Sequence, residues 1–353
     1  MAEVCLGFIV LGLTAYGVLG GADFGAGFWD LTAGGAQRGG RVRGLVQRSM
    51  SPVWEANHVW LIFVLVIAWT AFPVAFGAIF TTLAVPLFLA ALGIILRGTA
   101  FALRGQAGTM REARALGATF ALSSVLVPFF LGTVLGGIAA GEVRAEDPVA
   151  DTGAWTNATS LTIGVLAVMT GAYLAAVFLA GDARRAELPD LEEAFRRRAL
   201  GAGIVTGASA IVALLIVRSD ARALFDGLTS GGGLVAFLVS VAAGLVTLAL
   251  VWTRRFELAR FSAAVAVAGV VAGWVIANHP DILPGQLTLD DAAAADATLT
   301  ALVVSVGLGL VILVPSLWYL YRLVLTGTLD QAYEPLDQRF RPLTASDDDK
   351  ERP

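Results

Sequence analysis

The residues with the clearest chemical potential lie together in one decapeptide. Residues 52–61 read Pro-Val-Trp-Glu-Ala-Asn-His-Val-Trp-Leu and begin a long apolar segment. Glu55, Asn57 and His58 therefore fall in the first two turns of an expected membrane helix. Ionisable side chains are costly at such a depth and usually belong to an ion pathway or a functional site. A carboxylate and an imidazole three residues apart share a helix face, so the pair could pass protons.

A structural interpretation of the same two residues stays open. Ser51 is a suitable helix cap, and Glu55 in the first turn would experience both the helix dipole and desolvation, which act in opposite directions. Glu55 could then neutralise Arg97 or Arg48 and only hold the bundle together. His58 could likewise be a hydrogen-bonded structural histidine.

Two further charged residues occupy neighbouring apolar segments. Asp23 lies within Gly-Gly-Ala-Asp-Phe-Gly-Ala-Gly, and Arg97 lies about 10 Å before Arg104 at ~1.5 Å per residue. If three consecutive helices cross the membrane, Asp23, Glu55, His58 and Arg97 come to the same third of it. The sequence therefore predicts one shared cluster of these four side chains.

The glycines around Asp23 have a separate explanation. Gly21 and Gly25 form a GxxxG pair, which permits close contact between membrane helices. The segment lacks the strand–turn–helix context of a nucleotide-binding loop. We therefore interpret these glycines as packing positions.

The composition indicates a membrane protein of many spans. The chain has 353 residues, 57% of them hydrophobic and 15% charged, whereas soluble domains are about 25% charged. Cys5 is the single cysteine, which excludes an internal disulfide and a cysteine-ligated iron–sulfur site within this chain. The first segment starts with an acidic residue and has no evident cleavage site, so we interpret it as a retained span.

Apolar segments long enough to cross a bilayer, about 20 residues each, predict an all-α bundle of nine transmembrane helices. We assign residues 1–341 to a single integral membrane domain and residues 342–353 to a disordered cytoplasmic tail. The predicted spans are 4–28, 53–72, 76–103, 115–140, 158–180, 199–217, 232–252, 258–277 and 298–322.

The distribution of arginine predicts the orientation of the bundle. In this nine-helix arrangement, all but three of the 24 Lys and Arg residues fall on one side, and the exceptions are Arg144, Arg218 and Arg222. The positive-inside rule then places the N-terminus outside and the C-terminus in the cytoplasm. The Asp23 cluster lies in the cytoplasmic third, whereas His279, the second histidine, lies at the outer face. The two histidines cannot jointly ligate one haem, and a single axial ligand is disfavoured.

Several motifs together resemble subunit II of the cytochrome bd-type quinol oxidases. The resemblance covers nearly the whole chain, in the family's order, and the element running from Trp54 to Leu61 is the most specific part. The matching segments are Ala22–Gly27, Pro52–Leu61, Leu96–Phe101, Val127–Gly132 and His279–Pro284 leading to Leu287–Ala292.

The resemblance implies a nine-helix subunit without haem, paired with a haem-bearing subunit I in a bacterial cytoplasmic membrane. It implies haems b and d, or haem b alone, in that partner, and it leaves open a quinone bound here and a small accessory single-span subunit. The family's proton-path acids map onto Glu55 and Asp23. His58 stands where many members have Glu or Gln, which resembles a divergent, bd-like branch. Trp54, Asn57 and Trp60 would line the motif or a tunnel, although interfacial anchoring also explains the tryptophans.

The leading hypothesis is therefore a subunit of a quinol:oxygen oxidoreductase that supplies part of a proton path through Glu55, Asp23 and His58, with Arg97 as charge partner. Its partners would be subunit I, membrane quinol, O₂ and the lipid bilayer, with no nucleic acid and no metal bound by this chain. A proton- or ion-coupled secondary transporter is the alternative, and a purely structural scaffold for subunit I is a third. An oxidase subunit should purify with a haem-bearing partner, whereas a transporter should be colourless.

Overall fold

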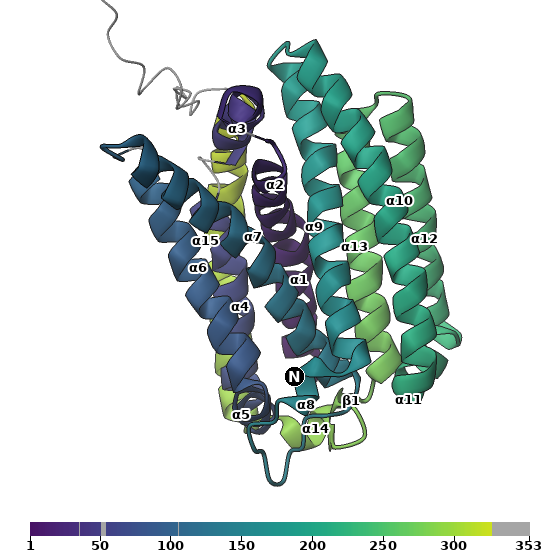
Figure 1. Cartoon of the computed structure of the whole chain (residues 1–353). Coiled ribbons are helices and arrows are strands. Elements are labelled where there is room, and N and C mark those ends of the chain that lie inside the picture. The colour runs from purple at the N-terminus through teal and green to yellow at the C-terminus, as the bar shows by residue number, and fades with distance from the viewer. Residues whose placement is uncertain (35, 51–53, 105, 327–353) are drawn as a thin grey trace, which may run out of the picture.

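In the computed structural model the chain is a bundle of long, roughly aligned helices (Figure 1). The structure describes residues 1–34, 36–50, 54–104 and 106–326, and it leaves the side chains of residues 36–38, 54, 55, 321, 324 and 325 undescribed. The predicted tail at 342–353 lies outside the described residues, and the single domain at 1–341 stays a prediction. The helices are α1 (Ala2–Ala15), η1 (Tyr16–Gly20, a π-helix), α2 (Gly21–Leu31), α3 (Ala36–Met50), α4 (Trp54–Ala71), α5 (Pro73–Thr82), α6 (Ala84–Arg104), α7 (Met110–Ala139), α8 (Gly153–Thr156), α9 (Ala158–Arg185), α10 (Pro189–Asp220), α11 (Arg222–Leu228), α12 (Gly231–Trp252), α13 (Phe256–Asn278), α14 (Leu289–Ala292) and α15 (Asp296–Leu325).

The long helices confirm the predicted polytopic bundle. Within the described residues, eight helices are long and apolar enough to cross a membrane, with α1, η1 and α2 counted as one, and a bent pair could supply a ninth span. The bent pair is α4 with α5, which meet at an angle of 119°. Over the described residues, the predicted spans and the observed helices follow each other in the same order.

The third predicted span is wrong at its start. Residues 76–82 belong to α5, which runs across the end of α4, and the span itself is α6, from Ala84 to Arg104. Pro73 is the first residue of α5, a position where its missing N–H is not needed. Because α4, α5 and α6 form one nearly continuous apolar run, hydropathy does not reveal these breaks.

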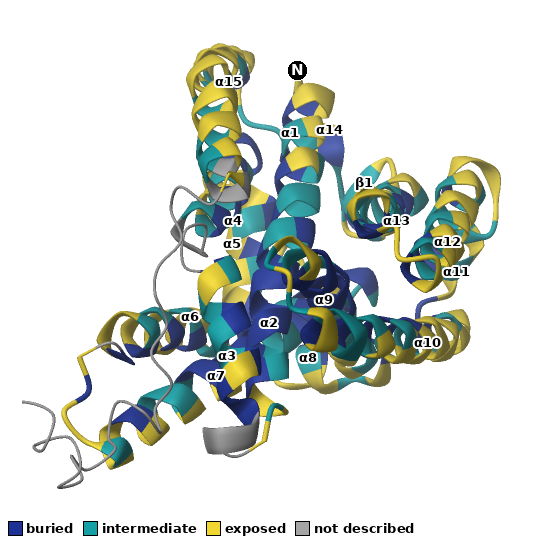
Figure 2. Cartoon of the chain, turned by 90° about the horizontal axis from the view of Figure 1, so that it is seen from above, coloured by how far each residue is buried: buried dark blue, intermediate teal, exposed yellow. Residues whose placement is uncertain are grey.

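The centre of the bundle is formed by α2, α7 and α9, seen from the end of the bundle in Figure 2. α9 is the most buried candidate span. A Cβ atom at Gly25 would lie 1.9 Å from the carbonyl oxygen of Gly171, so the backbones of α2 and α9 touch there. This contact confirms the packing role predicted for the glycines around Asp23.

The two ends of the bundle differ in charge. We call the end that carries α3 and the α9–α10 and α12–α13 connections the basic end. Ion pairs join its elements: Arg41 to Asp190, Arg185 to Glu257, and Arg254 to Glu192 and Glu193. The opposite end carries α5, α8, α14 and a two-stranded hairpin of β1 (Asp281–Leu283) and β2 (Leu287–Thr288), a small addition to the predicted all-α fold. Which end faces the cytoplasm stays a prediction.

Candidate functional site

A buried ion pair joins the first and third spans. Arg97 Nη2 on α6 lies 2.7 Å from Asp23 Oδ1 on α2, and it also donates to the Asp23 carbonyl oxygen at 3.3 Å. The side chains are 2% and 0% exposed. A charge can be kept at such depth only when it is paired and hydrogen-bonded. Sequence reasoning placed both residues at one depth, and the structure places them in direct contact.

Neighbouring side chains fix the guanidinium of Arg97. Its Nε donates to Ser124 Oγ on α7 at 2.9 Å, and that hydroxyl donates to the Phe120 carbonyl at 2.7 Å. The guanidinium carbon lies 4.8 Å from the centroid of the Phe24 ring and 4.9 Å from that of Phe120, so cation–π attraction adds to the pairing. α2, α6 and α7 therefore meet at this one side chain.

A second set of ion pairs joins the same two helices about two helical turns closer to the basic end. Arg104 Nη1 donates to Asp30 Oδ2 at 2.9 Å, and Arg43 Nε on α3 donates to Asp30 Oδ1 at 2.7 Å. Asp30 follows Asp23 by seven residues and Arg104 follows Arg97 by seven, so both pairs lie along the same α2–α6 contact. Asp30 was not among the predicted site residues, although the equal seven-residue spacing of the two acids and the two arginines is visible in the sequence.

We expect the ion pairs of Asp30 to stabilise the folded bundle strongly. In Asp30→Asn, two guanidiniums lose their shared counter-charge. We expect the free energy of unfolding to fall by roughly 3 kcal/mol, the lower end of the range for a broken buried pair, because Arg43 is partly exposed. Thermal inactivation of the purified complex measures this loss. An unchanged inactivation temperature would contradict the assigned role.

His58 and Asn57 contact the π-helical turn of the first span. Asn57 Nδ2 donates to the Leu19 carbonyl at 3.3 Å, within the π-helix. The His58 ring lies edge-on to Tyr16 and Phe24, with centroids 6.1 and 5.9 Å apart. π-helical turns occur frequently at functional sites. Through Phe24, whose ring lies beside Arg97, this contact connects the decapeptide to the Asp23 pair.

The remaining residues of the decapeptide are placed in part. Trp60 is 8% exposed and packs with Tyr16, Phe24 and Val127, so it lies inside the bundle rather than at the lipid interface. Trp54 and Glu55 form the first turn of α4, and their side chains lie outside the described residues. The structure therefore brings Asp23, Arg97, His58, Asn57 and Trp60 into one region.

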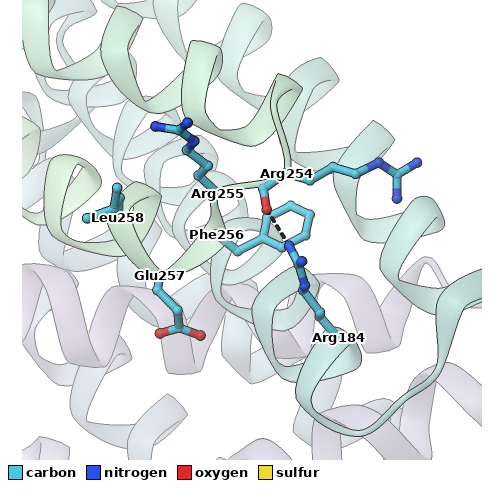
Figure 3. A pocket seen from close by; sticks show the side chains of 6 residues that line it. All are labelled: Arg184, Arg254, Arg255, Phe256, Glu257 and Leu258. Atoms are coloured by element: carbon cyan, nitrogen blue, oxygen red, sulfur yellow. Dashed lines mark hydrogen bonds between the residues drawn. The ribbon is translucent and has the colours of Figure 1, made fainter.

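A cavity of about 230 Å³ opens at the basic end, away from this cluster. It is lined by Arg184, Arg254, Arg255, Phe256, Glu257 and Leu258, and Arg184 donates to the Arg254 carbonyl across it at 2.6 Å (Figure 3). None of the residues of the Asp23 cluster lines it. The candidate cluster therefore lies in the buried contacts of α2, α4 and α6, and not in this cavity.

The second histidine is far from the cluster. His279 follows α13 at the end opposite the basic end, and its Nε2 lies 2.9 Å from Glu3 Oε1 near the start of α1. Across the described part of the chain, no group of three or more His, Cys, Asp or Glu side chains is arranged to hold a metal ion.

Known proteins resemble this chain over most of its length. Residues 1–324 match the family model for cytochrome bd terminal oxidase subunit II. A Bacillus subtilis (strain 168) protein described as a putative cytochrome bd menaquinol oxidase subunit II is 23% identical over 248 residues, 69% of each chain. The structure of bd oxidase from Geobacillus thermodenitrificans matches with a TM-score of 0.77 at 26% identity, covering 92% of this chain and 98% of that one.

These matches confirm the resemblance found in the motifs and do not favour the transporter alternative. They indicate a multi-pass protein of a bacterial membrane that acts with a partner subunit in a quinol-oxidising, haem-containing complex. The chain belongs to the cytochrome bd terminal oxidase subunit II family.

Proposed function

We propose that this chain carries protons from the basic end of the bundle toward the oxygen-reducing haem of subunit I. Reduction of O₂ to water consumes four protons and four electrons, and the electrons come from membrane quinol. The proposed route uses Glu55, Asp23 and His58, with Arg97 as the charge partner of Asp23. Trp54, Asn57 and Trp60 would line it.

The observation that carries this proposal is the state of the Asp23 carboxylate. One oxygen, Oδ1, is bound to Arg97, while Oδ2 is buried and has no hydrogen-bond partner among the described residues. Buried polar atoms almost always have partners, and exceptions accompany catalytic roles or bound water. Oδ2 is therefore available to accept a proton, while the hydrogen bond from Arg97 to Oδ1 holds the carboxylate in place.

The position of the other residues supports the same route. Glu55 starts α4, and His58 lies one helical turn further on, beside the Phe24 and Tyr16 rings. Positions three residues apart lie on one helix face, so positions 55 and 58 share a face of α4. The positive-inside rule predicts that the arginine-rich basic end faces the cytoplasm, from which the protons would be taken.

The test replaces the first acid of the route. Glu55→Ala in the purified complex is expected to lower O₂ reduction about tenfold, an increase of ~1.4 kcal/mol in the activation free energy, while haem content is retained. Glu257→Ala is the control, because this glutamate also lies at the basic end and its side chain is 62% exposed. Full activity in Glu55→Ala would leave the chain with the scaffold role alone.

A further inference from the structure

Around the Asp23 pair lie three buried polar atoms that have no hydrogen-bond partner within the described part of the chain. They are Tyr16 Oη, Asp23 Oδ2 and Trp60 Nε1, and their residues are 8%, 0% and 8% exposed. Each such atom costs about 1–3 kcal/mol when it stays unsatisfied. Their chemistry is complementary: the indole donates, the carboxylate accepts, and the phenol hydroxyl does both.

The three atoms belong to one region of the bundle. Tyr16 and Trp60 pack in the same cluster with Phe24, whose ring centroid lies 6.3 Å from that of Tyr16. The guanidinium carbon of Arg97 lies 4.8 Å from the centroid of the same Phe24 ring, so Phe24 contacts both the Tyr16 ring and the ion pair. The Tyr16 ring thus contacts Phe24, which lies beside the ion pair, and it also contacts the His58 ring.

Backbone geometry holds Tyr16 in this position. It is the first residue of the π-helix η1, and Asn57 donates to the Leu19 carbonyl within that turn. A Cβ atom at Gly20 would lie 2.9 Å from two carbons of the Tyr16 ring, so the glycine leaves the space that the ring occupies. The π-helical turn, Asn57 and Gly20 together place the phenol beside the pair.

We propose that Tyr16 is a proton-relay residue, and that its hydroxyl and one or more bound waters connect Asp23 Oδ2 with the region of Trp60 and His58. An internal water needs two to four polar partners, and these three atoms include the donors and acceptors that such waters bind. In each transfer, the phenol oxygen accepts the excess proton from a protonated water (H₃O⁺) on one side, which becomes neutral water, and releases its own proton to a neutral water on the other side, which becomes H₃O⁺. The phenol is neutral before and after. This inference rests on the proposed proton-uptake function.

The test removes one oxygen atom. In the complete oxidase complex, Tyr16→Phe is expected to slow proton uptake during a single turnover about tenfold and to change its solvent isotope effect, with haem absorbance retained. Trp60→Phe, which removes the indole N–H, should slow uptake by a smaller factor. The matched control is Tyr173→Phe on α9, a buried tyrosine in a different cluster, which should leave uptake unchanged.

The outcomes separate this inference from the function on which it rests. Wild-type uptake in Tyr16→Phe, with slow uptake in Glu55→Ala, overturns the relay and leaves the proposed function standing. Wild-type uptake in both variants overturns both. An equal slowing in Tyr16→Phe and Tyr173→Phe, with no change in isotope effect, would show a general packing effect and also overturn the relay.

Discussion

Arg97→Met is expected to abolish accumulation of the assembled oxidase in the membrane. The substitution leaves the Asp23 carboxylate buried without its counter-charge, and breaking a buried pair in this way costs about 3–5 kcal/mol. Folded proteins are stable by only about 5–15 kcal/mol, so the loss is a large share of the total. Haem absorbance of membranes, together with the amount of this chain detected in them, measures the effect.

Two further variants test the cause of that loss. Arg41→Met removes an ion pair whose side chains are 61% and 54% exposed, and exposed pairs contribute only ~0–1 kcal/mol. The double variant Asp23→Asn/Arg97→Met removes both buried charges and should recover much of the assembly, but not the turnover. Normal assembly of Arg97→Met, or no recovery in the double variant, would contradict the role of the pair.

Gly25→Ala is expected to have a comparable effect by steric means alone. The added methyl would lie 1.9 Å from the Gly171 carbonyl oxygen and 2.3 Å from its carbonyl carbon. Backbone atoms cannot turn aside as a flexible side chain does, so α2 and α9 would have to separate. That movement would displace Asp23, which lies two residues earlier on α2. We expect little assembled complex and a lower inactivation temperature in the fraction that remains.

The control for this variant lies on the same span. A Cβ atom at Gly7 on α1 would meet no atom of the described residues within 4 Å, so Gly7→Ala should assemble normally. Helix propensity alone would make both alanine variants slightly more stable. Equal stability of Gly25→Ala and Gly7→Ala would therefore contradict a direct backbone contact between α2 and α9.

The sequence predicts the bundle and the depth of its charged residues because both depend on local patterns. Apolar runs locate the spans, and the spacing of Asp23 and Arg97 from the span ends predicts that they share one depth. Their pairing was not determined, since Glu55 was an equally available partner for Arg97. Contact between two helices depends on their rotation, which hydropathy does not encode.

Other features depend on contacts between segments far apart in the chain. The bend before Pro73 lies inside an apolar run that reads as continuous. The π-helix at Tyr16 is stabilised by Asn57 from another helix, so nothing in residues 16–20 alone indicates it. Asp30 was not predicted as a site residue, because within its own segment it is simply another acidic residue near the end of a span. Its seven-residue offset from Asp23 gains meaning once Arg104 is seen at the same offset from Arg97.

The central claim is that protons for oxygen reduction enter this chain from the basic end and pass Asp23. The most direct measurement places the complete complex in sealed vesicles of known orientation and follows pH on each side during quinol oxidation. We predict proton consumption on the side that the basic end faces, with a rate reduced about tenfold in Asp23→Asn. Consumption from the opposite side, or an unchanged rate in Asp23→Asn, would contradict the account.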